Sequence, residues 1–533
     1  MKRLINYIGL GFIAAAIGIS SCTGDFQDIN TNPTGVSDED LLQDNNAVGL
    51  YFVTLQEAIH FNYDYGEGNS WSYQVYQNLN ADIWSGYMAT ASHFAGGVNN
   101  QTYFMVSGWN DNCWNWTYAY LMTTSQKIKE KIEETGETYV HFGSINKILR
   151  VLGMSRMVDQ YGPIIYTKYG ESLTGGTYDS GIDAYKAFFR ELTEAVTELN
   201  EMISKPIASF ASFDMAYKGD LSKWVKLANS LRLRLAMRIV KYDSALAKQE
   251  FESAIKAPQG LLSNVDELLQ FSGFNYGNPL YTLSVSWNDI SINASLISIM
   301  GGYEDTRLPK YGTLDKNGKV SGVRAGIPGL DVIGPKYKEI ISRFNIADAF
   351  EPLPLFSPAE TYFLLAEAAL RGWSVSGSAQ QYYEDGVKVS FEQWGASIGD
   401  YLERIKKPAD WIDPVESAFN APAASSVSPK WADASSDEER LEKIITQKWI
   451  ANWPEGMNAW AEVRRTGYPK LFRIIENKSE NPVIQTELGP RRLPYPLKEK
   501  SDNPAGYADA VKMLGGSDNA NTRIFWDIDK PNL

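Results

Sequence analysis

The chain has 533 residues, of which 44% are hydrophobic and 13% aromatic, and its formal net charge is −14. This composition is typical of a folded globular protein rather than a disordered one. The acidic balance argues against a nucleic-acid partner, which would require a basic face. The length alone would allow several domains, and a single large helical domain is also compatible with it.

The first 22 residues carry a targeting signal: a basic pair, an apolar run, and small residues before Cys22. This order is typical of a lipoprotein signal peptide, which is cut before a cysteine that is then acylated. We therefore predict a signal peptide over residues 1–21, an acylated tether over 22–39, and Cys22 as the lipid anchor. An ordinary signal peptide with a coincidental cysteine is the alternative. Cys113 is the only other cysteine in the sequence. Because acylation uses the thiol of Cys22, no internal disulfide is expected.

The next part of the chain is acidic and rich in aromatic residues. Between Thr23 and Gln126 there is no Lys or Arg, whereas eleven residues are Asp or Glu. Residues 61–118 hold fifteen aromatic residues interleaved with Asn, Gly, Ser and Asp. Flat rings beside amide and carboxylate side chains are the materials of a polar pocket on which a ligand stacks. Ordinary packing in the core is the alternative for any single ring.

Apolar residues at helical spacing predict a long series of helices. They are expected at about 40–61, 72–83, 114–133, 144–160, 182–203, 221–240, 244–257, 358–371, 379–394, 437–452 and 456–465. Successive helices of this size form antiparallel pairs in the size class of tetratricopeptide units. Residues 260–354 are richer in Gly, Pro, Asn and Ser, and we interpret them as a long loop-rich insertion, where binding residues concentrate.

The stretch DLSKWVKLANSLRLRLAMRIVK is an amphipathic helix with Asp220 as its N-cap. Its polar side is expected to contain Lys223, Lys226, Ser230, Arg234 and Met237. Arg232 interrupts the apolar side, so it must find a carboxylate on a neighbouring helix. Removing Arg232 is expected to cost roughly 3 to 5 kcal/mol because that carboxylate would be stranded.

The stretch PLFSPAETYFLLAEAALRG predicts a second capped helix. Ser357 is its N-cap, Glu360 completes a capping box, and Gly372 supplies the left-handed stop. Glu367 and Arg371 are spaced for an i,i+4 ion pair on the opposite face. We interpret these carboxylates as a cap and a pair rather than as catalytic groups.

Four strings, in order along the chain, resemble the SusD/RagB family of surface nutrient-binding lipoproteins of Bacteroidetes. They are WVKLANSLRLRLAMRI, SPAETYFLLAEAALRGW, EERLEKIITQKWIANWPEGMNAWAEVRRTGYPKL and GPRRLPYPLKEKSDNPAG. The resemblance implies an all-α fold, with tetratricopeptide-like helical pairs forming a superhelical scaffold in a single domain over residues 40–533. The pairing of Asp305 with Arg307 in YEDTR also resembles an element of this family, and a salt bridge that pins the loop is its expected structural role.

The resemblance further implies binding of a nutrient oligosaccharide and its delivery to a SusC-like TonB-dependent transporter, at the outer membrane and facing the exterior. No enzyme activity and no cofactor are expected. Three alternatives remain: an oligopeptide binder like RagB, an all-helical glycoside hydrolase, and a structural lid with negligible affinity of its own. The sequence has no HExxH motif, no P-loop and no GxGxxG after a strand. It also has no GxSxG nucleophile elbow, because its GxSxG string at 395–399 follows a predicted helix rather than a strand. Paired carboxylates for glycoside hydrolysis are not excluded.

The residue types of the aromatic stretch favour an uncharged ligand. A neutral sugar offers C–H faces for stacking and hydroxyls for Asn and Asp, whereas an anionic polymer would need Lys or Arg nearby. We therefore predict an uncharged glycan stacked on one or more rings of this stretch, with a tryptophan of the later loop region as the opposing wall. The candidates are Trp71, Tyr73, Trp84, Trp109, Trp114 and Trp116, opposed by Trp287. No catalytic or metal-binding residue is predicted.

Overall fold

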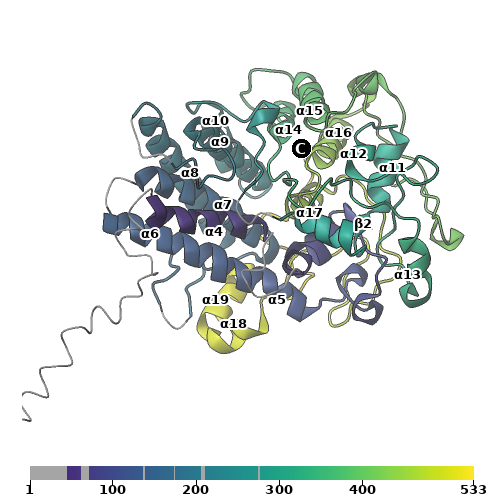
Figure 1. Cartoon of the computed structure of the whole chain (residues 1–533), viewed down its shortest axis with the longest axis horizontal. Helices are drawn as coiled ribbons and strands as arrows, with labels where there is room; N and C mark the ends of the chain where they lie inside the picture. The colour runs from purple at the N-terminus through teal and green to yellow at the C-terminus, as the bar shows by residue number, and fades with distance from the viewer. Residues whose placement is uncertain (1–44, 62–70, 136–138, 173–174, 206–209, 274–276) are drawn as a thin grey trace, which may run out of the picture. The chain divides into compact units, whose positions relative to one another are not determined.

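The computed structural model describes residues 45–61, 71–135, 139–172, 175–205, 210–273 and 277–533 (Figure 1). The signal peptide, the tether, Cys22 and the first part of the helix predicted at 40–61 lie outside these ranges. The chain divides into two units, Met1–Gly49 and Leu50–Leu533. Apart from the first residues of α4, the structural features discussed below belong to the second unit.

The described residues are mostly helical, as predicted. The longer helices are α4 (Asn46–His60), α5 (Ser107–Trp116), α6 (Thr123–Thr135), α7 (Val140–Tyr161), α8 (Gly181–Met202), α9 (Leu221–Arg238), α10 (Ser244–Ile255), α14 (Pro358–Leu370), α15 (Ala379–Gln393), α16 (Asp437–Ala451), α17 (Gly456–Thr466) and α19 (Pro504–Leu514). The shorter ones are α11 (Ala294–Gly302), α12 (Leu308–Tyr311), α13 (Leu330–Lys338) and α18 (Leu497–Asp502). Three π-helical segments are η2 (Gln74–Asp82), η5 (Thr117–Met122) and η8 (Tyr281–Ser286). Single 3₁₀ turns are η3 (Phe94–Gly97), η4 (Asn100–Thr102), η7 (Val265–Glu267), η9 (Tyr401–Glu403), η10 (Ser417–Phe419) and η11 (Trp431–Asp433).

Two helix starts show how the capping residues act. The Asp220 carboxylate accepts hydrogen bonds from the backbone N–H groups of Ser222 and Lys223, at 2.9 and 3.2 Å. The Ser357 hydroxyl accepts one from Ala359 N–H at 3.2 Å. Both N-caps are therefore confirmed. Because Glu360 turns away toward α9, the predicted capping box of α14 is wrong.

Helix packing follows the predicted pairs. In Figure 1, α6 to α10 lie side by side in sequence order, and α14, α15 and α16 form a second packed set. Contacts between α9 and α14 join the two sets. This arrangement confirms the all-α fold with tetratricopeptide-like pairs. The helix predicted at 114–133 is wrong at its start, since α5, η5 and α6 follow one another over residues 107–135.

A two-stranded antiparallel sheet ties the aromatic stretch to the loop-rich insertion. Strand β1 (Met88–Ala89) pairs with β2 (Ser291–Ile292), with Met88 opposite Ile292. Beneath it, Ala89 packs in a buried cluster with Val323 and Leu330 of the insertion. Loops some two hundred residues apart in the chain are thereby fixed beside each other.

Helix α9 is buried on almost every side. Arg232 pairs with Glu250 of α10, with a hydrogen bond of 2.7 Å, which confirms the predicted partner on a neighbouring helix. Ser230, Arg234 and Met237 of the expected polar side are also buried, so that assignment is wrong. The reason is that α14 packs against this side of α9 and supplies Glu360 as a partner for Arg234.

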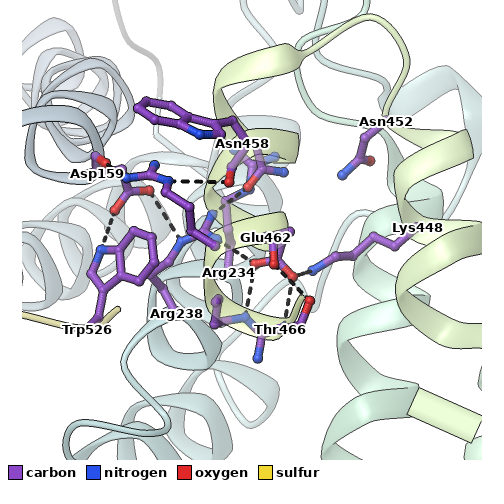
Figure 2. Close-up of polar contacts among 12 residues, drawn as sticks. Asp159, Arg234, Arg238, Lys448, Asn452, Asn458, Glu462, Thr466 and Trp526 are labelled. Atoms are coloured by element: carbon purple, nitrogen blue, oxygen red, sulfur yellow. Dashed lines mark hydrogen bonds and ion pairs between the residues drawn. The ribbon is translucent and has the colours of Figure 1, made fainter. Parts of the chain in front are cut away.

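Buried ion pairs join the scaffold helices (Figure 2). Arg234 donates two hydrogen bonds to Glu360, at 2.9 and 2.6 Å, and Asn452 and Asn458 donate to the same carboxylate. Arg238 lies between Asp159 of α7 and Glu462 of α17. These bonds connect α7, α9, α14, α16 and α17, so the charges are used for helix packing.

Glu462 and Glu367 are the most heavily paired carboxylates of this network. Glu462 contacts Arg238, Lys448 and Arg465, and Glu367 contacts Arg371 and Arg465. Burial alone would raise the pKa of Glu367, but Arg465 and Arg371 lower it to about 2. The same balance holds the pKa of Glu462 well below its ordinary value. The predicted i,i+4 pair of Glu367 with Arg371 is confirmed, within a larger buried network.

Candidate functional site

Two of the seven predicted ligand-binding rings, Tyr73 and Trp84, are packed in the core near η2. Tyr73 is 1% exposed and donates a hydrogen bond to Asp82 Oδ2 at 3.2 Å. Trp84 is 8% exposed, donates from Nε1 to the carbonyl of Asn100 at 3.0 Å, and packs against Trp460. A ring enclosed in this way offers no face to a ligand, so neither is retained as a stacking residue.

Trp114 is enclosed as well, at 3% exposure. Its indole N–H donates to Glu499 Oε1 at 3.3 Å. Four tyrosine rings surround it with centroid distances between 4.8 and 5.8 Å; they belong to Tyr118, Tyr161, Tyr178 and Tyr495. This cluster anchors α5 and thereby fixes the direction of the other side chains on that helix.

Trp109 and Trp116 lie on one face of α5. They are seven residues apart, which on an α-helix places them on the same side and about 10 Å apart along the axis. Both are half-buried, with part of each ring in solvent. The amide of Asn112 lies on the same side of the helix and donates to Gly108 O at 3.0 Å.

Two more rings extend this line at its ends. Trp71 is 40% exposed, and its ring centroid is 6.1 Å from that of Trp116. The half-buried Phe94 meets Trp109 edge to face, with centroids 6.4 Å apart and an interplanar angle of 90°. We call Trp71, Phe94, Trp109 and Trp116 the aromatic face. Phe94 was not singled out from the sequence, although it lies in the same aromatic stretch. The available signal in the sequence was the pair of glycines after Ala95, because they permit the left-handed turn that presents Phe94.

Trp287 stands on a separate loop that is fastened near the aromatic stretch. It is 38% exposed and directly follows η8. Two residues later, the Asp289 carboxylate accepts a hydrogen bond from Ser92 Oγ at 3.0 Å, and the Asp289 backbone carbonyl accepts one from Thr90 Oγ1 at 2.6 Å. Lys338 of α13 lies 3.5 Å from the same carboxylate. The fold therefore brings a cation to this region that the local sequence lacks, paired with Asp289.

The three π-helical segments all adjoin exposed or half-buried candidate rings. Trp71 lies three residues before η2, Trp116 directly precedes η5, and Trp287 directly follows η8. π-helical turns inside helices are rare and are frequent at functional sites. Their placement gives a second reason, independent of exposure, to place the site on these rings.

The chemistry available here is stacking and hydrogen bonding. Half-buried Asp111 lies on α5, and burial raises the pKa of its carboxyl. Within the described ranges, no group of three His, Cys, Asp or Glu side chains is arranged to hold a metal ion. Among the helices that the structure describes, none has the length and apolar character needed to cross a membrane.

A scaffold of tetratricopeptide-like helical pairs that carries a partly exposed row of aromatic rings is the architecture of a helical-repeat binding protein. Residues 28–527 match the SusD-like family, described as Susd and RagB outer membrane lipoprotein, so the chain belongs to this family. Comparison with curated proteins finds no match.

Solved structures give the same family. A chitin-binding SusD homolog from Flavobacterium johnsoniae is 41% identical, with a TM-score of 0.86, covering 91% of this chain and 100% of that one. A SusD homolog from Bacteroides vulgatus is 39% identical, with a TM-score of 0.87 and coverage of 92% and 99%. One from Bacteroides uniformis is 33% identical, with a TM-score of 0.82 and coverage of 91% and 99%.

Proposed function

We propose that this protein binds a neutral oligosaccharide on the aromatic face and delivers it to a SusC-like TonB-dependent transporter at the cell surface. The proposal depends chiefly on the row of partly exposed rings along α5, which suits the alternating C–H faces of a sugar chain. A 41% identical relative is described as chitin-binding. Chitin is a neutral glycan, so oligosaccharides of N-acetylglucosamine are the first ligands to test.

Substitution of single rings tests the site. Trp109→Ala and Trp116→Ala should each weaken binding of chitin oligosaccharides by about 1 to 3 kcal/mol, by analogy with bases stacked on aromatic rings. Titration calorimetry on the mature protein measures the affinity, and thermal unfolding checks the fold.

Phe350→Ala is the matched control, since this ring is 72% exposed and does not belong to the aromatic face. Its affinity should equal that of the wild type. Unchanged affinity in both α5 variants, or a preference for anionic glycans or peptides over the neutral series, would contradict the proposal.

The anchor and the partner form the second half of the proposal. Cys22 holds the acyl chains, so Cys22→Ala should yield a folded protein that leaves the membrane fraction. Membrane recovery at the wild-type level would contradict this assignment. Affinity purification of the anchored protein from its native host should then retain a TonB-dependent transporter.

We also propose that the protein binds glycans without cleaving them. The most heavily paired carboxylates, Glu360, Glu367 and Glu462, are buried in ion pairs between helices, where no sugar can reach them. Prolonged incubation with the bound oligosaccharide should give no change in chain length by chromatography. Release of shorter oligosaccharides that occurs only when the protein is present would favour the hydrolase alternative.

A further inference from the structure

A cavity that shares no lining residue with the aromatic face lies where the turn after α17 meets the C-terminal segment. Its volume is about 390 Å³. Eight of its lining residues are Lys or Arg and three are Asp or Glu. In the chain as a whole, acidic residues outnumber basic ones by 64 to 50. We call this feature the basic cavity.

Several of its cations are already neutralised within the protein. Arg491 and Arg523 share the carboxylate of Asp527, and Arg473 pairs with Glu487 at 3.1 Å. In contrast, none of the ion pairs found among the described residues uses Lys241, Arg464 or Lys530. The cavity therefore has an excess of positive charge that the described part of the chain does not balance.

Arg464 is the most unusual of these cations because it is only 4% exposed. Its Nη1 donates to the carbonyl oxygens of Asp159 and Arg491, at 2.6 and 2.8 Å, and its guanidinium stacks on Trp460 at 3.7 Å. Its Nη2 has no hydrogen-bond partner in the described structure. A buried guanidinium held only by carbonyls and rings is costly, and burial lowers its pKa to about 9.

Lys241 lies at the end of the segment after α9 and is half-buried. Burial and the nearby guanidinium groups of Arg465 and Arg371 lower its pKa to about 8, opposed by the more weakly acting carboxylates of Asp527 and Glu438. Repulsion among these cations is relieved when an anion binds between them. Lys530, which is exposed, completes the rim of the cavity.

We propose that the basic cavity binds the phosphate, sulfate or carboxylate group of a small ligand. Clustered guanidinium and ammonium donors are the groups that recognise such oxyanions. The volume exceeds that of a bare ion, so there is space for an uncharged part of the ligand, such as one sugar ring. This site is independent of the neutral glycan proposed for the aromatic face.

Calorimetric titration of the mature protein with sodium sulfate, inorganic phosphate and glucose 6-phosphate tests the proposal, with glucose as the uncharged control. The three anions should bind and glucose should not. Tighter binding of glucose 6-phosphate than of phosphate would identify a phosphorylated sugar as the ligand class, and equal affinity would identify the free oxyanion. Failure of all three anions to bind, at an ionic strength held constant with sodium chloride, would overturn the proposal.

Two variants at the accessible rim locate the site without disturbing buried Arg464. Lys241→Gln and Lys530→Gln should each weaken sulfate binding by about tenfold, the loss expected for one charge-assisted hydrogen bond. Lys319→Gln removes an exposed lysine of the insertion and should leave the affinity unchanged, as should Trp109→Ala. Equal weakening in Lys241→Gln, Lys530→Gln and Lys319→Gln would show a general charge effect and overturn the assignment.

The pH dependence provides an independent readout. Sulfate keeps its charge across the titration of Lys241, whose pKa is about 8. Binding of sulfate should therefore tighten as the pH falls through about 8 in the wild type, and this change should be smaller in Lys241→Gln. An identical pH profile in both proteins would exclude Lys241 as a ligand.

Discussion

In the helical scaffold, carboxylates such as Glu462 lie buried among several cations, whereas on the aromatic face Trp71 keeps 40% of its surface exposed. In both regions the side chains are in unfavourable surroundings: charged groups are buried in the scaffold, and apolar rings are exposed to solvent on the aromatic face. The scaffold offsets the cost internally, because each of these carboxylates is met by Arg or Lys from another helix. On the aromatic face, apolar rings remain in contact with solvent, and a ligand that covered them would gain the free energy of their burial. Stability and binding should therefore respond to different substitutions.

The largest effect is expected at Glu462. Glu462→Gln keeps the volume but removes the charge that faces Arg238, Lys448 and Arg465, leaving three buried cations with less compensation. The free energy of unfolding should fall by about 3 to 5 kcal/mol, measured by urea denaturation. Glu201→Gln, at an exposed position near the end of α8, should stay within about 0.5 kcal/mol of the wild type.

Arg232 provides a graded comparison with Glu462. Its side chain is 13% exposed and that of Glu250 is 10% exposed, so water screens the pair partly. Arg232→Ala should therefore cost about 1 to 3 kcal/mol, less than the 3 to 5 kcal/mol that the sequence alone suggests for a fully buried pair. If Arg232→Ala lost as much unfolding free energy as Glu462→Gln, the exposure of an ion pair would not determine how strongly it stabilises the fold.

Glu57 of α4 provides the opposite case to Glu462, because it is a buried carboxyl that forms no ion pair with a cation among the described residues. It is 4% exposed, its Oε1 has no partner among the described residues, and burial raises its pKa from 4.5 to about 7. Since the folded state prefers the neutral form, the stability that this group contributes is complete below pH 4.5 and is lost as the pH rises through about 7.

Glu57→Gln imitates the neutral form and should therefore be more stable than the wild type at pH 8, by about 1 to 3 kcal/mol. The difference should vanish below pH 4.5. Asp82, whose pKa burial raises to about 7, is present in both proteins, so its contribution to the pH dependence cancels. Parallel stability profiles of the two proteins would mean that Glu57 titrates normally.

The sequence predicted the helices and their N-cap residues well because the apolar period and the N-cap residue types are local properties. It placed Arg234 on a solvent face, since the position of α14 beside α9 is a long-range property that a helical wheel does not contain. The same limit applies to the rings. Trp114 and Trp116 are two residues apart in one helix, yet Trp114 is enclosed by tyrosines from distant segments, whereas Trp116 is half-buried. Local composition identified the stretch, and only tertiary packing separated core rings from accessible ones.

The smallest effect is expected at Trp287, and it tests how far the aromatic face extends. Its loop is fastened to the aromatic stretch through Asp289, Thr90 and Ser92, but no ring contact links Trp287 to the row along α5 in the described structure. Trp287→Ala should therefore weaken binding of a short chitin oligosaccharide by less than about 1 kcal/mol, while longer oligosaccharides lose more because they can reach the outlying ring. Calorimetry over a series of chain lengths measures this dependence, with Trp109→Ala as the comparison that should weaken every length alike. If Trp287→Ala reduced the affinity of the shortest ligand as much as Trp109→Ala does, Trp287 would belong to the centre of the site and would be the opposing wall predicted from the sequence.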